Sequence, residues 1–241
     1  MASAARRADP GLVVATLRRA ARHGPFFELE VVPAGQPRTG APLADLYRQA
    51  GRFDLAELVD HHARRLRTTE RRVAASLLFQ GIAARLWSPV VGCLRDGLVP
   101  DLDPEHLFWW RASPLGLSTD RPTGWITAYL APRLAETVLA ETVLDANLAP
   151  LARALRQVTP VAAGLLWGNA ASALVGTALV ADDEAVRTVV RRLLEREPLR
   201  GTTTALAGTG PVRVRRRSCC LFYRVPDGGL CGDCALHSGT R

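Results

Sequence analysis

Apolar side chains recur every three or four residues over much of the chain, which is the period of an amphipathic helix. Asp9 and Pro10 form a helix cap and a first-turn proline, and Val13, Leu17 and Ala20 share one face behind them. This pattern predicts a helix that closes near residues 23–24. Equivalent patterns predict helices over residues 42–50 and 53–66, from 69 to an interruption at 88–89, and over 124–197 with breaks at Pro132, Pro150 and Pro160. Within the last range, one buried face is predicted on either side of Pro150, and the acids at 182–184 are predicted to open the final helix. That face consists of Leu144, Leu148, Leu151 and Leu155.

Segments with β-strand character are short and few. Residues 26–32 form one strand candidate, residues 211–214 another, and residues 106–111 and 115–118 are predicted to pair as a small hairpin. Trp109 and Trp110 would then face opposite sides of that hairpin. Residues 96–106, rich in acids and prolines, are expected to form a loop. The predicted fold class is therefore α+β, with a predominantly helical body and a small antiparallel β element.

One stretch carries no charge at all. Residues 161–181 are long enough to cross a bilayer, but they are rich in alanine and glycine and include Asn169, Ser172 and Thr177. We favour a buried central helix of a globular bundle over a transmembrane span, and a peripheral association with the inner face of the membrane stays open. Asn169 would need a buried hydrogen-bond partner. His61 and His62 are expected on a solvated helix face, since adjacent positions point to different faces.

Composition limits the function classes. The chain has 241 residues, 48% hydrophobic and 22% charged, which is ordinary for a soluble globular protein. Its formal charge of +8 comes from arginine, and the sequence contains no lysine, which excludes a P-loop lysine, a Schiff base and a lysine general base. The N-terminus lacks the apolar core of a signal peptide, so we expect a cytoplasmic protein with reduced thiols. The isolated Cys93 is expected to be a small buried hydrophobe.

The other four cysteines lie together near the C-terminus. Cys219 and Cys220 are adjacent, and Cys231 and Cys234 follow after ten intervening residues. Four thiolates on a loop of this size predict a metal site, and both a structural zinc and an iron–sulfur cluster take such a set. Neighbouring cysteines diverge in direction, which favours the two separated irons of a binuclear cluster, but the spacing leaves both alternatives open.

This Cys-Cys-x10-Cys-x2-Cys pattern resembles the C-terminal signature of the ferric siderophore reductase (FhuF-like) family. The flanking matches are Arg216-Arg217, Tyr223-Arg224, Pro226-Asp227 and Gly232-Asp233, with a weaker similarity at residues 165–169. The resemblance implies a [2Fe–2S] cluster held by Cys219, Cys220, Cys231 and Cys234, and an oxidoreductase that acts on ferric siderophores. The Gly- and Thr-rich link at residues 201–210 predicts a boundary between two domains, a mostly helical reductase-like body over 1–205 and a [2Fe–2S]-binding module over 206–241.

Arginines surround the cysteines. The last thirty residues contain six arginines and two aspartates, so they carry half of the net charge. Arg215, Arg216, Arg217 and Arg224 are the candidates for docking an anionic chelate or tuning the cluster, because cations stabilise its reduced form. General solvation is the alternative role, and nucleic-acid binding is less favoured because the run is short and adjoins the cysteines.

The source of electrons is expected to lie outside the chain. No Gly-x-Gly-x-x-Gly motif and no second cysteine set occurs, so a separate donor such as a ferredoxin, or a small reductant, is predicted. The leading hypothesis is a cytoplasmic [2Fe–2S] ferric siderophore reductase without catalytic residues beyond the cluster ligands. A zinc-stapled nucleic-acid-binding or regulatory protein and an iron- or redox-sensing [2Fe–2S] protein are the alternatives.

Overall fold

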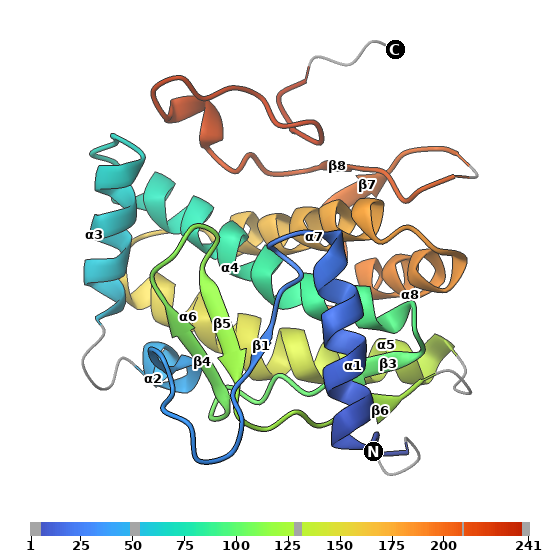
Figure 1. The fold of residues 1–241 in the computed structure, drawn as a ribbon. Helices are drawn as coiled ribbons and strands as arrows, with labels where there is room; N and C mark the ends of the chain where they lie inside the picture. The colour runs from blue at the N-terminus through green and yellow to red at the C-terminus, as the bar shows by residue number, and fades with distance from the viewer. Residues whose placement is uncertain (1–5, 49–53, 128–131, 209, 238–241) are drawn as a thin grey trace.

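The computed structural model describes residues 6–48, 54–127, 132–208 and 210–237, and its fold is α+β, as predicted (Figure 1). The helices are α1 (Pro10–Ala20), α2 (Leu43–Arg48), α3 (Leu55–Arg65), α4 (Arg71–Leu94), α5 (Pro132–Leu139), α6 (Ala149–Val158), α7 (Ala163–Val180) and α8 (Glu184–Leu194), with 3-10 turns η2 (Ala21–His23) and η4 (Phe222–Arg224) and a π-helical segment η3 (Ala140–Leu148). The strands are β1 (Glu30–Val31), β2 (Ala41–Pro42), β3 (Leu98–Pro100), β4 (Leu107–Trp110), β5 (Gly116–Thr119), β6 (Gly124–Ile126), β7 (Thr203–Ala205) and β8 (Val214–Arg216).

Helix α4 runs through the centre of the body and packs against α7, α3, α1 and β3 (Figure 1). The predicted interruption at Ser88-Pro89 is wrong, since α4 continues through Pro89 to Leu94. Pro89 removes one backbone donor, which normally costs about 3 kcal/mol in a helix interior. Burial of α4 on almost every side outweighs that local cost, and the Ser88 hydroxyl bonds the Ala84 carbonyl at 2.7 Å within the affected turn.

Helices α4 and α7 are both long and apolar enough to cross a membrane by length and composition. In the folded protein they pack against each other, and the relevant stretches are 78% and 56% buried. This degree of burial is typical of core helices in a globular bundle. The stretch without charges predicted as a central helix is α7, and Leu166, Ala170 and Leu174 on it are fully buried.

The β structure includes more pairing than the sequence predicted. The predicted hairpin is present as β4 and β5, with Trp109 opposite Leu117, and Trp109 is buried while Trp110 is half-buried. β1, shorter than the predicted strand, pairs in parallel with β5, and β2 completes the order β1-β5-β4-β2. The expected loop after residue 96 contains β3, which pairs with β6 where a helix was expected. The missed strand β3 and the missed strand β6 have one cause, which is their pairing with each other across a long stretch of sequence. Gly124 permits this pairing because it has no side chain to block the Val99 carbonyl.

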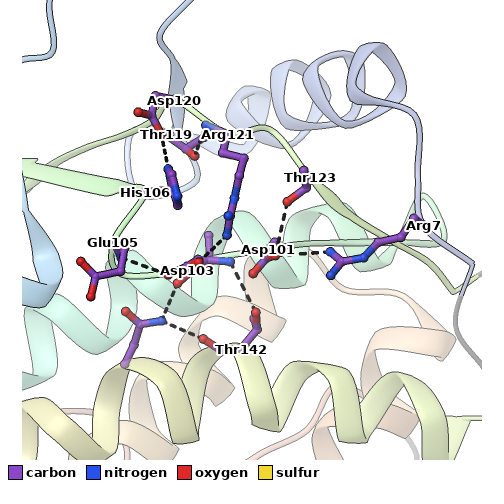
Figure 2. Close-up of polar contacts among 12 residues, drawn as sticks. Arg7, Asp101, Asp103, Glu105, His106, Thr119, Asp120, Arg121, Thr123 and Thr142 are labelled. Atoms are coloured by element: carbon purple, nitrogen blue, oxygen red, sulfur yellow. Dashed lines mark hydrogen bonds and ion pairs between the residues drawn. The ribbon is translucent and has the colours of Figure 1, made fainter. Parts of the chain in front are cut away.

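Polar side chains lock the loops at the end of these strands (Figure 2). Asp103 pairs with Arg121 and also accepts the Glu105 backbone N–H at 3.1 Å. His106 Nδ1 lies 2.8 Å from an Asp120 carboxylate oxygen, whose partner oxygen accepts a bond from Arg38 at 2.6 Å. Each of these two carboxylates is paired with basic side chains of neighbouring loops, so the network holds the loops in place.

A continuous helical rod follows from α5 through η3 to α6. Leu144, Leu148, Leu151 and Leu155 are all fully buried along it, as their spacing predicted. The expected break at Pro150 is absent. The preceding turn is π-helical, with the Ala149 N–H bonded to the Leu144 carbonyl, and this wider turn accommodates the backbone N–H that Pro150 lacks. Helix α8 begins as predicted at Asp183, whose carboxylate accepts the Ala185 N–H at 2.8 Å.

Candidate metal centre

The C-terminal segment, residues 210–237, lies across α7 and α4 (Figure 1). It enters through the antiparallel pair β7–β8 and turns twice before the end of the described chain. Leu221 and Asp227 have left-handed backbone angles, with φ of 72° and 61°, and a Cβ at Gly228 would lie 2.1 Å from the Phe222 carbonyl oxygen. This tight loop brings the second cysteine pair back beside the first.

The four predicted ligands form one group, which we call the cysteine cluster: Cys219, Cys220, Cys231 and Cys234. The Sγ atoms of Cys220 and Cys231 are 3.7 Å apart. Two sulfurs on one tetrahedral metal, each about 2.3 Å from it, are separated by about 3.8 Å. Cys234 lies close enough to Cys219 to raise its pKa, so the thiols are arranged as two neighbouring pairs.

This arrangement fits a two-iron core better than a single ion. Cys220 lies beside Cys231, and Cys219 lies beside Cys234. A binuclear cluster takes two cysteines at each iron, which is the number in each of these pairs. Backbone N–H groups of Leu221 and Leu236 point to the sulfurs of Cys219 and Cys234 at 3.3 and 3.4 Å, and donors of this kind stabilise thiolates.

Electrostatics around the thiols require a cationic partner. The pKa of Cys231 is raised to about 12: burial is the largest cause, Arg216 opposes it, and Cys220 and Asp233 add to it. Burial also raises the pKa of Cys219, with Cys234 and Cys220 adding to the effect. Thiols packed this closely repel one another when ionised, and a bound metal removes that penalty because it is itself positively charged.

Arg216 is buried at the centre of the site, with 2% of its surface exposed. Its Nη2 contacts the Cys231 sulfur and lies 3.0 Å from the Asp233 carboxylate, while its Nη1 donates to Asn169 Oδ1 at 2.9 Å. Burial lowers the pKa of Arg216, but Asp233, Cys220 and Cys231 raise it more, so the net shift is upward. Its Nε–H is buried without a partner among the residues described. A [2Fe–2S] core brings sulfide acceptors of the kind that this donor lacks, so the residues present fit the group.

The other three predicted arginines lie at the surface or half-buried. Arg215 donates to the His237 carbonyl at 2.8 Å, Arg217 to the Thr204 hydroxyl at 3.3 Å, and Arg224 pairs with a carboxylate at the start of α4. They hold the C-terminal segment to itself and to the body. Of the four arginines, Arg216 is therefore the one that the structure places against a cysteine sulfur.

Two polar residues that sequence reasoning did not assign to the site complete it. Asn169 on α7 donates through Nδ2 to the carbonyl and the hydroxyl of Ser76 on α4, both at 2.9 Å. The Ser76 hydroxyl in turn donates to the Cys220 carbonyl at 2.7 Å. The available signal was a lone asparagine in an apolar helix, which must find a partner. Its neighbour Trp167 packs edge-on against Phe79 and does not enter this network.

Close packing between α7 and the C-terminal segment depends on one glycine. A Cβ at Gly168 would lie 2.5 Å from the Ser218 hydroxyl, whereas none at Gly164 or Gly176 would meet an atom within 4 Å. Gly168 therefore lets the C-terminal segment approach α7 closely. Cys93 is fully buried in the body, as predicted, and burial raises its pKa.

Comparison with known proteins identifies the segment. Residues 216–236 match the family model of the FhuF 2Fe-2S C-terminal domain, and this range contains the cysteine cluster and Arg216. No curated protein matches the chain. The predicted resemblance and the predicted [2Fe–2S] cofactor are both confirmed for this segment, while the body upstream of it is described by its structure alone.

Proposed function

We propose that the protein is a ferric siderophore reductase, which reduces chelated Fe(III) by one electron in the cytoplasm so that Fe(II) is released. The observation that carries the proposal is the position of the cysteine cluster within a FhuF-type segment at the protein surface. Cys219 and Cys231 are half-buried, whereas Cys220 and Cys234 are covered. An electron can therefore leave through the exposed side without the chelate entering the core.

The chemistry needs no covalent catalysis. When bound, the [2Fe–2S] core supplies a single electron, which converts the chelated Fe(III) to Fe(II) while one iron of the core returns from Fe(II) to Fe(III). Oxygen chelators hold Fe(II) far less tightly than Fe(III), because Fe(III) is the harder cation. A separate one-electron donor, a ferredoxin-like protein or a small reductant, must then restore the electron.

The chain's own residues position and bias the site. Arg216 places a buried cation against Cys231, which stabilises the more negative, reduced state and raises the reduction potential. Asn169 and Ser76 hold that cation and the Cys220 backbone to the rigid pair α4 and α7. Among the residues that the structure describes, Arg215 and Arg217 bond only neutral oxygens and leave positive charge around the rim, which favours the approach of an anionic chelate, whereas the charge of Arg224 is compensated by Glu70.

A single-turnover experiment tests the proposal. Anaerobically purified protein is reduced, freed of excess reductant, and mixed with a ferric chelate and an Fe(II) trap, and we expect about one Fe(II) per two-iron centre. Cys231→Ser should lose the two-iron spectrum and the turnover, whereas Cys93→Ala should retain both. A protein purified with zinc and without iron and sulfide would overturn the proposal. Reoxidation of the centre without trapped Fe(II) would favour a sensor.

A further inference from the structure

A pocket that the reductase chemistry does not use lies between α3, α4 and the turn from β4 to β5. Its volume is about 170 Å³. An apolar cavity of about 150 Å³ is enough to bind a benzene ring, so this pocket admits one aromatic ring. Its walls are aliphatic and aromatic side chains: Phe26, Leu58, Leu77, Leu78 and Ile82.

The rim of the pocket is basic. His61, His62 and Arg65 reach it from α3, so these histidines line a pocket and do not form the solvated face expected from the sequence. Arg111, from the β4–β5 turn, pairs with Glu57 at 2.9 Å. Arg65 makes no hydrogen bond or ion pair with any residue that the structure describes, so its guanidinium is available to a ligand. Burial lowers the pKa of His62 to about 4, with Arg65 and His61 adding to the effect, and its ring is a neutral donor or acceptor at pH 7.

A buried cation also lies beneath the pocket. Arg85 is 2% exposed and donates to the backbone carbonyls of Leu115 at 2.6 Å, Pro25 at 3.1 Å and Glu28 at 2.7 Å, as well as to that of Phe26. Burial lowers its pKa to about 10, against which the Glu28 carboxylate acts, so it stays charged at pH 7. Carbonyl groups orient the guanidinium without cancelling its charge. The floor of the pocket is therefore electropositive as well as apolar.

We propose that this pocket binds an aromatic anion, with the ring against the leucines of α4 and the negative group against the guanidinium of Arg65, which is unpaired among the described residues. In the reduction of ferric chelates, the pocket would hold one aromatic ring of an anionic chelate in preference to a ring of a neutral chelate; this role rests on the proposed function. A ring-sized apolar cavity with cations at its rim and floor selects for this combination of shape and charge.

The position of the pocket suits that role. Ser76 on α4 bonds the Cys220 carbonyl, and the next two residues, Leu77 and Leu78, line the pocket. The two sites thus lie on different sides of the same turn of α4, and a helix with its side chains is about 10–12 Å across. A chelate held by one ring in the pocket is then separated from the cysteine cluster by about the width of one helix.

Binding is tested with benzoate and its neutral isostere benzamide on the cluster-loaded protein, by calorimetry and ligand-observed NMR. We expect benzoate to bind at least about tenfold more tightly than benzamide, because hydrogen bonds to a charged group are the stronger ones. Arg65→Gln should weaken benzoate about tenfold or more. The same change at Arg64, an exposed neighbour on α3 that does not line the pocket, should not.

A steric variant gives a second test that does not depend on charge. A Cβ at Gly81 on α4 meets no atom within 4 Å and the residue lines the pocket, so Gly81→Leu should fill the pocket and abolish benzoate binding. Gly176→Leu, on the open face of α7, makes the same change elsewhere and should leave binding intact. Equal affinity for benzoate and benzamide, or undiminished binding by Gly81→Leu, would overturn the proposal.

Kinetics separate this inference from the proposed function. With an anionic ferric complex of 2,3-dihydroxybenzoate, Arg65→Gln should raise KM about tenfold and change kcat much less, and with neutral ferric acetohydroxamate it should change neither. If no chelate is reduced while the benzoate results hold, the reductase proposal fails and the anion site stands. If chelates are reduced and the KM for the anionic complex is the same in the Arg65 and Gly81 variants as in the wild type, the assignment of the pocket to the chelate is refuted.

Discussion

Replacing Asn169 by leucine tests whether the buried polar network holds the metal centre to the body. The Asn169 side chain accepts a bond from Arg216 and donates two to Ser76, and it is 1% exposed. Leucine is close to asparagine in size but offers neither a donor nor an acceptor. The Arg216 Nη1 group would therefore stay buried while losing its partner from α7.

The cost can be worked from these contacts. A buried donor left without a partner costs about 1–3 kcal/mol, and more when the group is charged. Loss of the bonds to Ser76 adds little, because its carbonyl lies inside α4 and its hydroxyl still donates to the Cys220 carbonyl. We expect Asn169→Leu to lower the free energy of unfolding by about 2–3 kcal/mol. It should also lower the reduction potential, since a less firmly held Arg216 stabilises the reduced centre less.

Urea unfolding followed by tryptophan fluorescence measures the first effect, and a redox titration of the visible spectrum measures the second. Asn147→Leu is the matched control. Asn147 is also fully buried, donating to the Leu102 and Thr142 carbonyls at 2.8 and 2.7 Å, but it lies far along the chain from the cysteines. It should cost similar stability and leave the potential unchanged. An unfolding cost below about 0.5 kcal/mol with an unchanged potential in Asn169→Leu would refute the reasoning.

Two further predictions concern packing and pH. Alanine normally stabilises a helix by roughly 1 kcal/mol relative to glycine. Gly168→Ala should not show this gain in stability, because its Cβ would displace the facing serine hydroxyl, whereas Gly176→Ala should show it. Equal shifts in the melting temperature of the two variants would contradict this prediction. Burial raises the pKa of Asp120, but bonds from His106 and Arg38 lower it more, so the net shift is downward. This carboxylate therefore stabilises the fold above its unfolded pKa, and the contribution is lost as the pH falls below about 4. The stability of wild type should accordingly approach that of Asp120→Asn in acid unfolding curves, and a constant difference would count against the assignment.

Local signals predicted the parts of this structure that depend on local physics. The cap at Asp9, the acids before α8 and the leucine repeat of the α5–α6 rod all gave correct helices, because capping and periodicity act within a few residues. The cysteine spacing likewise predicted that the four thiols would lie together. The helix breaks predicted at Pro89 and Pro150 were wrong for the same reason, because the effect of a proline was judged from its neighbours in sequence. Burial of α4 accommodates Pro89, and a π-helical turn accommodates Pro150.

What the sequence could not predict are contacts between distant segments. Ser76 meets the Cys220 backbone across 144 positions, and Arg216 meets Asn169 across 47. The strand pair β3–β6 and the pocket behind α3 have the same origin, because each requires knowing which elements become neighbours. Asn169 was recognised as needing a partner, but only the fold shows that the partner is the arginine beside a cysteine.

These distant contacts attach the metal centre to the helical body. The C-terminal segment is too short to bury a core of its own, so a bound metal would supply part of its stability. The remainder comes from α4 and α7, which offer Ser76, Asn169 and the surface at Gly168 to it. Since α4 also carries the wall of the anion pocket, one rigid helix fixes both the electron-carrying site and the site that we propose for the chelate. The distance between them is then set by the packing of the C-terminal segment on α4 and α7.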